Sequence, residues 1–237
     1  MNRPIISIIT VVFNAGMALE ETIKSILNQE NDSFEYLIID GGSTDETIDV
    51  IKKYRDRIST WVSEPDKGIY DAMNKGIRLA KGKYICFINA GDLLSEIPIN
   101  KVSKSTADLI SFPVKLSNGN VFIPKVDFSL KIRNTLPHQG CYYKKTPELR
   151  YDTNFKVFSD FCLNQKMFKN KMVIEAFQDP IVAFHDMGGI SHDKKYSKEI
   201  FKVVRQNFGL HYQLLSWVYF KKQGLKLRFN NIISKLI

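Results

Sequence analysis

The sequence has little of what marks membrane-spanning, exported or disulfide-bonded chains. Its three cysteines, Cys86, Cys141 and Cys162, are an odd number at wide spacing, which fits neither a disulfide framework nor a CxxC zinc pair. No apolar run approaches the roughly 18 residues that a membrane-spanning helix needs. The start of the chain, Met1 to Pro4, lacks the apolar region and cleavage site of a signal peptide. We therefore expect a protein of the reducing cytoplasm.

Two common nucleotide-binding motifs are also missing. The stretch from Gly76 to Lys83 has one residue too many for a phosphate-binding P-loop, and Tyr84 follows it where that motif needs Ser or Thr. The glycine fingerprint GxGxxG does not occur. These absences argue against a P-loop protein and against a dinucleotide-binding protein of the GxGxxG type. The length of 237 residues, with 44% apolar side chains, is enough for a domain with a well-buried core.

Acidic residues are scarce at one end of the chain. The formal net charge is +9, but residues 1–192 hold 24 Lys and Arg against 23 Asp and Glu, whereas residues 193–237 hold 10 against 2. Such a basic surface attracts nucleic acid, anionic lipid or phosphorylated ligands. A basic nucleic-acid-binding protein is one hypothesis, although the near-neutral part offers no recognition helix or RNP-type aromatic motif.

Strand-like and helical patterns alternate through the first hundred residues. We expect strands at residues 5–13, 36–39, 61–62 and 84–88, and helices at residues 18–27, 47–54 and 69–80. This alternation predicts an α/β fold with a mostly parallel sheet flanked by helices. Shorter segments at 109–112, 121–123 and 141–143 and a helix near 159–168 predict a smaller α+β half.

We therefore divide the chain into a domain at 1–192, with halves at 1–100 and 101–192, and a basic tail at 193–237. The tail has near-helical apolar spacing, carried by Leu210, Leu214, Trp217, Val218, Leu225, Phe229, Ile232, Ile233 and Leu236. Lysines and the aromatic residues Tyr219 and Phe220 accompany this pattern. It fits an interfacial helix on an anionic membrane, or a helix packed on the domain with a solvated basic face.

Polar residues follow each of the first four predicted strands. The four loops begin at Phe13, Asp40, Glu64 and Asn89 and carry acids, amides and glycines. In an open parallel sheet, ligands bind outside the carboxyl ends of the strands. These groups suit a nucleotide sugar, because carboxylates and amides accept hydrogen bonds from base and ribose and a carboxylate can hold a divalent cation on the diphosphate.

Structural roles are the alternative for these residues. Ser43 and Glu46 have the spacing of a capping box, and Asp45 would complement a helix dipole. Asp40 and Asp92 could be turn residues beside glycine.

Four segments together resemble the ordered motifs of family 2 glycosyltransferases. They are TVVFN from Thr10, IDGGSTD from Ile39, EPDKGIYDAMNKG from Glu64 and INAGD from Ile88. The DKGIYDAMNKG stretch is similar to bacterial enzymes that build O-antigen, capsule or other surface polysaccharides. The resemblance covers roughly residues 5–190 and implies the glycosyltransferase-A fold, a nucleotide-sugar donor and a divalent metal.

The resemblance also implies roles for individual residues. Asp92 matches the last acid of the DxD-type motif, which holds the metal. The implied donor-binding residues are Thr10, Val11, Phe13, Asn14, Asp40, Gly41, Asp66, Gly68, Tyr70, Asn74, Asn89, Ala90 and Gly91. Gly41 and Gly91 each stand where many members have a second acid, so base recognition rests on Asp40 and neighbouring backbone, with UDP favoured.

The second half supplies candidates for the reaction itself. Asp160 is a lone acid at the start of a predicted helix; it is either a helix N-terminal acid or, as the resemblance implies, the base that deprotonates the acceptor. The segment with His138 and Gln139 resembles the part of these enzymes that lies beside the acceptor site. The alternative is that both side chains have only a structural role. His185 matches the position, late in the sequence, where members of this fold often have a histidine that binds the metal; the alternative is a histidine of the core. An imidazole ligand favours Mn²⁺ over Mg²⁺.

These expectations combine into one hypothesis. It is an inverting, metal-dependent hexosyl- or N-acetylhexosaminyl-transferase that moves one sugar from a UDP-sugar to a lipid-diphosphate-linked saccharide on the inner face of the plasma membrane, with no nucleic-acid partner. Inversion follows from the resemblance, because no second carboxylate is placed as a nucleophile. A nucleotidyltransferase of similar architecture is the alternative enzyme. A processive synthase is disfavoured, because the chain has no QxxRW motif.

Overall fold

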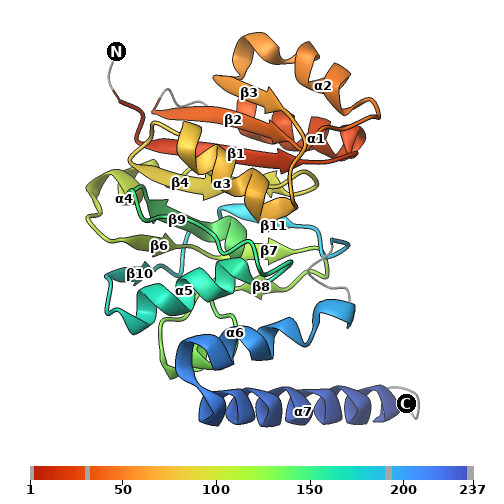
Figure 1. Cartoon of the computed structure of the whole chain (residues 1–237), viewed down its shortest axis with the longest axis vertical. Coiled ribbons are helices and arrows are strands. Elements are labelled where there is room, and N and C mark those ends of the chain that lie inside the picture. The colour runs from red at the N-terminus through yellow and green to blue at the C-terminus, as the bar shows by residue number, and fades with distance from the viewer. Residues whose placement is uncertain (1–2, 30–32, 190–193, 234–237) are drawn as a thin grey trace.

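A seven-stranded sheet joins the two predicted halves of the chain (Figure 1). The computed structural model describes residues 3–29, 33–189 and 194–233. The sheet consists of β1 (Ile6–Val12), β2 (Phe34–Asp40), β3 (Thr60–Ser63), β4 (Tyr84–Phe87), β6 (Leu109–Ser111), β9 (Cys141–Lys144) and β10 (Ile174–Ala176), in the order β10-β6-β9-β4-β1-β2-β3. The α/β prediction is confirmed: β3, β2, β1 and β4 are parallel, and β9 is antiparallel to both β4 and β6.

Alternation along β1 explains why helices cover both faces of the sheet. All seven residues of β1 are buried, and successive side chains of a strand point to opposite faces. Ile6 and Ile8 pack in a core with α1 (Gly16–Leu27), α2 (Thr47–Lys53) and α4 (Ile99–Lys104). Ile9 and Val11 pack in a second core with α3 (Ile69–Leu79), α5 (Ser159–Lys169) and α6 (Glu199–Phe208). A continuous apolar strand therefore needs two helical layers.

A second sheet of four short strands was not predicted. Its order is β5 (Leu93–Leu94), β11 (Ala183–His185), β7 (Val114–Leu116) and β8 (Val121–Phe122). The described ranges also contain short 3-10 turns: η1 (Arg55–Arg57), η2 (Phe128–Lys131), η3 (His138–Gly140) and η5 (Lys194–Tyr196). Antiparallel pairing of β11 with β5 sets Phe184 against Leu93. Continuing that register by one residue brings His185 opposite Asp92.

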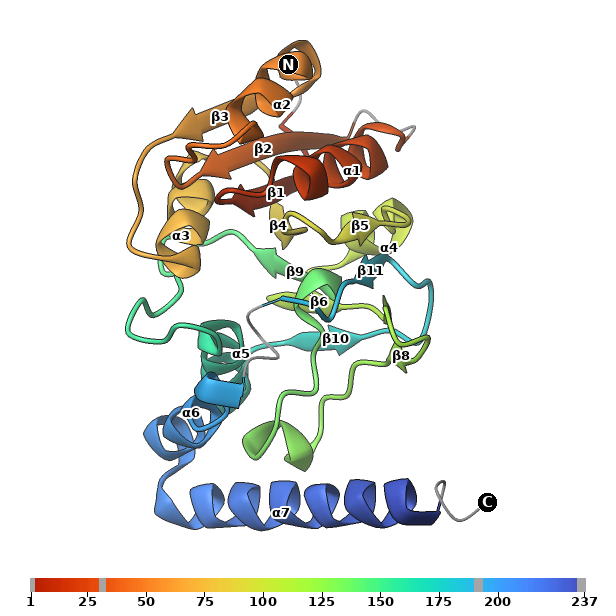
Figure 2. The same ribbon diagram turned by 90° about the vertical axis from the view of Figure 1, so that its right-hand side faces the viewer.

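The segment predicted as a tail divides into two helices with different surroundings. In α6, Ile200, Val203 and Val204 are buried in the core that also contains α5. Helix α6 is therefore packed into the folded unit, because its apolar face covers α5. Helix α7 (Leu210–Ile233) lies at the end of the molecule farthest from β1–β3 (Figures 1 and 2).

One side of α7 contacts the domain, where the Ser216 hydroxyl donates to the Ile132 carbonyl at 2.6 Å. The predicted apolar side chains from Leu225 onward lie outside the described part, as does Leu236. In the ranges that the structure describes, no helix is long and apolar enough to cross a bilayer.

Candidate active site

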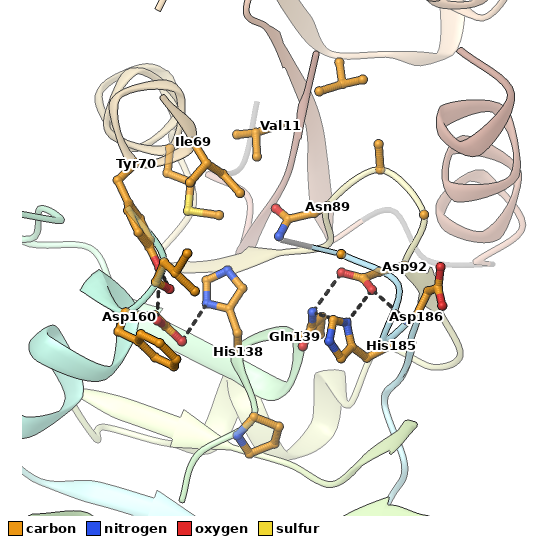
Figure 3. Close-up of a pocket in the computed structure, with 18 of the residues that line it drawn as sticks. Val11, Ile69, Tyr70, Asn89, Asp92, His138, Gln139, Asp160, His185 and Asp186 are labelled. Carbon is orange, nitrogen blue, oxygen red and sulfur yellow. Dashed lines mark hydrogen bonds and ion pairs between the residues drawn. The ribbon is translucent and has the colours of Figure 1, made fainter. Parts of the chain in front are cut away.

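A cavity of about 560 Å³ opens where β1 and β4 end (Figure 3). This is where the strand order reverses around β1, the position at which open α/β sheets bind ligands. The cavity is lined by six of the thirteen predicted donor residues and by every predicted catalytic, acceptor and metal residue: Val11, Phe13, Tyr70, Asn89, Ala90, Gly91, Asp92, His138, Gln139, Asp160 and His185. Residues far apart in the sequence therefore meet in one space.

Asp92 lies at one end of this cavity within a polar cluster. This residue is almost fully buried, at 4% exposure. Its Oδ2 accepts a hydrogen bond from Gln139 Nε2 at 2.8 Å, and its Oδ1 lies 2.7 Å from His185 Nδ1. The backbone N–H of Asp186 also donates to Oδ1, at 3.2 Å. Gln139, predicted beside the acceptor, thus bonds the predicted metal ligands, because η3 points it away from His138 (Figure 3).

This end of the cavity fits a divalent cation that is shared with a substrate. Asp92 and His185 would hold it, with one carboxylate oxygen and one imidazole nitrogen already side by side. The described residues contain no cluster of three or more acidic, His or Cys side chains able to bind a metal. Two protein ligands are enough for an ion that takes its remaining ligands from a diphosphate and water.

The turn that presents Asp92 requires glycine before it. Gly91 has φ +96°, a backbone conformation that residues with a Cβ rarely adopt. Its N–H donates to the Thr22 hydroxyl at 3.0 Å, and that hydroxyl donates to the Asp92 carbonyl at 2.8 Å. Glycine therefore meets a conformational requirement at position 91.

Asp160 lies at the other end of the cavity, in the first turn of α5. The Tyr70 hydroxyl donates to its Oδ1 at 3.1 Å and also to the Val157 carbonyl. Burial, and next the charge of Asp160, raise the pKa of Tyr70 well above its ordinary value. Tyr70 therefore stays protonated and keeps donating, which leaves Asp160 Oδ2 to face His138 (Figure 3).

His138 combines burial with unused hydrogen-bonding capacity. Its Nδ1 is 3.8 Å from Asp160 Oδ2, which is too long for a hydrogen bond, and neither ring nitrogen has a partner. The ring stacks on Phe87 with 5.7 Å between centroids. Burial lowers the pKa of His138 despite the nearby Asp160, so the imidazole is neutral at pH 7. An uncharged group that can donate or accept therefore stands beside Asp160.

The loop after β2 is built around Asp40, which lies outside this cavity. Asp40 is fully buried, and its Oδ2 accepts from Gly42 N at 3.1 Å, Ser43 N at 3.0 Å and Ser63 Oγ at 2.6 Å. The Ser43 hydroxyl donates to Asp40 as well. Ser43 therefore does not form the alternative capping box, and Asp40 shapes the loop through its own hydrogen bonds.

Gly41 marks a close approach beside this loop. A Cβ at Gly41 would lie 2.5 Å from Asp66 Oδ2 and 3.4 Å from Phe13 Cδ2. The Asp66 carboxylate therefore occupies the space that a side chain at Gly41 would fill, and it supplies an acid there from the loop after β3. Phe13 is 63% exposed and extends from this point to the cavity.

Three other predicted donor residues use their side chains to hold the loops together. Thr10 is fully buried and donates to the Ile88 carbonyl at 2.7 Å. Asn14 accepts from Thr44 N at 2.9 Å, and Asn74 donates to the Tyr151 carbonyl at 3.0 Å. None of the three lines the cavity, and Gly68 lines a smaller neighbouring hollow. Their hydrogen bonds support the edge on which a ligand would rest.

Sequence reasoning missed some residues that line the cavity. Lys156, Asn134 and Asp186 contribute polar side chains, and Leu116, Phe122 and Phe158 contribute apolar ones. Asp186 directly follows His185, so its proximity could have been inferred. The others come from loops and from the second sheet, and of these only Phe122 lies in a segment predicted from the sequence, at 121–123.

Comparison with known proteins agrees with this arrangement. The sequence model of Glycosyl transferase family 2 matches residues 7–170, more than half of the chain. A PGL/p-HBAD biosynthesis glycosyltransferase of Mycobacterium bovis is 28% identical over 227 residues, which cover 84% of this chain and 85% of that protein.

Solved structures agree in fold. S. aureus TarS 1-349 in complex with UDP-GlcNAc superposes with a TM-score of 0.69 at 17% identity, over 85% of this chain and 64% of that one. The Pyrobaculum calidifontis mannosyltransferase PcManGT, in complex with GDP-Man and Mn²⁺, gives a TM-score of 0.65 at 18% identity, over 89% and 67% of the two chains.

The family match favours glycosyl transfer over the nucleotidyltransferase and nucleic-acid-binding alternatives. The motifs that carry it, from the loop after β1 to Asp92, are the segments that gather at this edge of the sheet. The chain is a glycosyltransferase and belongs to Glycosyl transferase family 2.

Proposed function

We propose that this glycosyltransferase moves one sugar from a nucleotide-sugar donor to an acceptor hydroxyl, with inversion at the anomeric carbon and with help from a divalent cation. The supporting observation is that two carboxylates, Asp92 and Asp160, stand at opposite ends of one cavity. Asp92, beside His185, suits the donor diphosphate. Asp160, held by Tyr70, suits the acceptor.

Asp160 acts as the general base in this proposal. The acceptor oxygen attacks the anomeric carbon while the bond from that carbon to the diphosphate breaks, and Asp160 Oδ2 takes the hydroxyl proton. His138 orients the same hydroxyl through a ring nitrogen that has no protein partner. A single displacement inverts the anomeric centre.

Asp92 and His185 hold the cation in this proposal. When bound, a divalent cation neutralises the charge that develops on the leaving diphosphate. We favour Mn²⁺ over Mg²⁺, because Mn²⁺ accepts an imidazole ligand more readily. Gln139 orients both ligands, since its amide lies 2.8 Å from each.

The nucleotide would lie along the loops after β1, β2 and β3. Phe13 offers an exposed ring for stacking beside the carboxylate of Asp66. We favour UDP as the nucleotide. Two structures with the same fold hold UDP-GlcNAc and GDP-Man, so both nucleotides belong in the test.

A thermal-shift panel tests the donor assignment, because a ligand that binds only the native state raises the unfolding temperature. The panel contains UDP-, GDP- and dTDP-sugars, each with and without Mn²⁺. We expect a UDP-sugar with Mn²⁺ to give the largest shift, and Asp92→Asn to remove the part that depends on Mn²⁺. Failure of every sugar nucleotide to shift the wild-type protein would contradict the assignment.

The acceptor is a lipid-diphosphate-linked saccharide of bacterial surface polysaccharide synthesis in this proposal, such as O-antigen or capsule, reached at the inner face of the plasma membrane. Helix α7 supports this location. Leu214, Trp217 and Val218 are 54%, 49% and 42% exposed, and Lys221 lies over the Trp217 ring at 4.5 Å. These positions share one helix face, which suits insertion into an anionic lipid surface.

Vesicle sedimentation tests the membrane assignment. We expect the protein to bind phosphatidylglycerol vesicles more strongly than phosphatidylcholine vesicles, and Trp217→Glu to weaken this binding by placing a negative charge on the apolar face. Trp61→Glu is the matched control, because Trp61 is also partly exposed, at 36%, but lies on β3. Equal binding of both lipids, or unchanged binding by Trp217→Glu, would contradict membrane docking by α7.

A further inference from the structure

Glu199, the first residue of α6, bonds a segment of the chain that lies just before α5. Its Oε1 accepts the backbone N–H of Lys156 at 2.8 Å. Its Oε2 accepts the backbone N–H of Val157 at 2.7 Å and that of Phe158 at 2.9 Å. One carboxylate from the basic end of the chain therefore binds three successive amides.

These amides need an acceptor from elsewhere in the fold. They belong to the N-cap residue of α5 and to the two residues before it, so the helix supplies them with no carbonyl partner. Successive N–H groups that converge in this way form an anion-binding concavity. Phe158 is the N-cap of α5 and has no side chain able to accept a hydrogen bond. Glu199 accepts the N–H of this N-cap residue from 41 residues away in the sequence.

The segment held by Glu199 also determines the surroundings of Asp160. The Val157 carbonyl accepts the Tyr70 hydroxyl, which donates to Asp160 Oδ1 as well. Lys156, Val157 and Phe158 line the cavity together with Asp160. A displacement of this segment would therefore move the hydrogen-bond donor of Asp160 and the first turn of α5 together.

We propose that Glu199 is a positioning residue for the reaction: its carboxylate fixes residues 156–158 and thereby holds Asp160 at the geometry that proton transfer needs. The inference rests on the proposed function of Asp160 as the base. It gives α6 a part in catalysis, although α6 contributes none of the residues that line the cavity.

Packing of α6 on α5 contributes to stability separately from the bonds of Glu199, and Asn207 takes part in this packing. Asn207 Nδ2 donates to the Cys162 carbonyl at 3.3 Å and to Gln165 Oε1 at 3.0 Å. These contacts join the same two helices away from residues 156–158. Asn207→Ala therefore weakens the helix pair without removing the anchor of that segment, and it is the matched control.

The experiment compares Glu199→Gln, Asn207→Ala, Asp160→Asn and the double variant Asp160→Asn with Glu199→Gln, all in the full chain. Turnover is measured as UDP released when UDP-N-acetylglucosamine is hydrolysed in the presence of Mn²⁺, with water in place of the acceptor hydroxyl. We expect Glu199→Gln to lower kcat by about tenfold to a hundredfold, the scale of a small misplacement of a catalytic group, with donor KM unchanged. Asn207→Ala should lower the unfolding temperature and keep kcat.

Two further measurements separate positioning from general loss of structure. In the Asp160→Asn background, Glu199→Gln should cause no further loss of turnover, because effects of residues that act as a unit are not additive. Amide hydrogen exchange, which needs no substrate, should speed up at Val157 and Phe158 in Glu199→Gln and stay unchanged there in Asn207→Ala.

Faster exchange with unchanged kcat in Glu199→Gln, or equal losses of kcat in Glu199→Gln and Asn207→Ala, would overturn the role of Glu199. If Asp160→Asn is inactive, the assignment of Asp160 as the base remains supported whether or not the role of Glu199 is overturned. Full turnover by Asp160→Asn would instead remove the proposed base, and the positioning role with it.

Discussion

The two ends of the cavity hold their carboxylates in different ways. Both oxygens of Asp92 are bonded to polar groups, from Gln139, His185 and the Asp186 backbone. Asp160 has one fixed partner, Tyr70, and its other oxygen faces a histidine ring without forming a hydrogen bond. Aromatic rings pack behind this second end, where Tyr151 lies 5.2 Å from Tyr70 between ring centroids.

This difference shows how one cavity can assign two roles to the same chemical group. A carboxylate among polar groups can exchange those hydrogen bonds for a cation, as Asp92 would. A buried carboxylate with one oxygen left without a fixed partner can accept a proton from a substrate, as Asp160 would. The different surroundings of the two aspartates therefore give them different roles. Enzymes that use one carboxylic acid as an acid and another as a base follow the same principle.

The largest effect is expected when the base is removed. Asp160→Asn keeps the shape of the side chain and an oxygen that can accept the Tyr70 hydroxyl, but an amide cannot take a proton. We expect kcat to fall by about 10²- to 10⁴-fold, the usual contribution of a general base, with donor affinity unchanged. Steady-state release of UDP gives kcat and KM separately. A drop in donor affinity with normal kcat would place Asp160 at the donor end instead.

At the other end, Gln139→Ala should weaken Mn²⁺ binding by about tenfold to a hundredfold, the scale for residues that orient metal ligands. Titration with Mn²⁺ in the presence of UDP measures this affinity. Gln165→Ala is the control, since Gln165 is also buried and hydrogen-bonded, to the Leu130 carbonyl at 2.9 Å, but lies outside the cavity. If both variants bound Mn²⁺ like the wild type, Gln139 would have no part in the metal end.

A smaller change is expected from Tyr70→Phe, which removes the hydroxyl that donates to Asp160. A hydrogen bond to a charged group contributes about 1.5–3 kcal/mol. We therefore expect roughly a tenfold or greater loss of kcat, without loss of Mn²⁺ affinity. Tyr36→Phe serves for comparison, because the buried Tyr36 hydroxyl bonds Thr10 rather than a cavity group. Equal losses of kcat in the two variants would point to general destabilisation.

The mildest prediction concerns the pH dependence of stability. The pKa of folded His138 is lowered from its ordinary value of 6.5, mainly by burial. Below pH 6.5 the unfolded chain therefore binds a proton that the folded chain resists, so stability falls as the pH drops. His138→Gln should flatten this fall when unfolding temperatures are compared from pH 7.5 to pH 5. An unchanged slope would show that His138 titrates alike in both states.

Much of the fold could be predicted because its local patterns are strong. The first strands are apolar and β-branched, so β1 and β2 were placed to within about two residues at each end. The edge where ligands bind also followed, because consecutive parallel strands end on the same side. The predicted segment at 121–123 matches β8, which pairs with the nearby β7, but the second sheet as a whole could not be predicted, since β5 has two residues and relies on β11, which is distant in the sequence.

The candidate site was predictable in composition but not in its contacts. Asp92, Asp160, His138 and His185 do line one cavity. The sequence could not show that the neighbours His138 and Gln139 point to opposite ends, because that depends on how η3 meets β11. It also could not show that Glu199, one of only two acids after residue 192, bonds the segment before Asp160.

Calorimetric titration of UDP distinguishes the two proposed roles, in which Asp92 binds the cation and Asp160 takes the proton. Titrations of Asp92→Asn and Asp160→Asn are compared with and without Mn²⁺. We expect Asp160→Asn to keep the full gain in UDP affinity that Mn²⁺ provides while losing turnover, and Asp92→Asn to lose this gain. Loss of the gain in Asp160→Asn, or its survival in Asp92→Asn, would show that the two aspartates do not divide these roles.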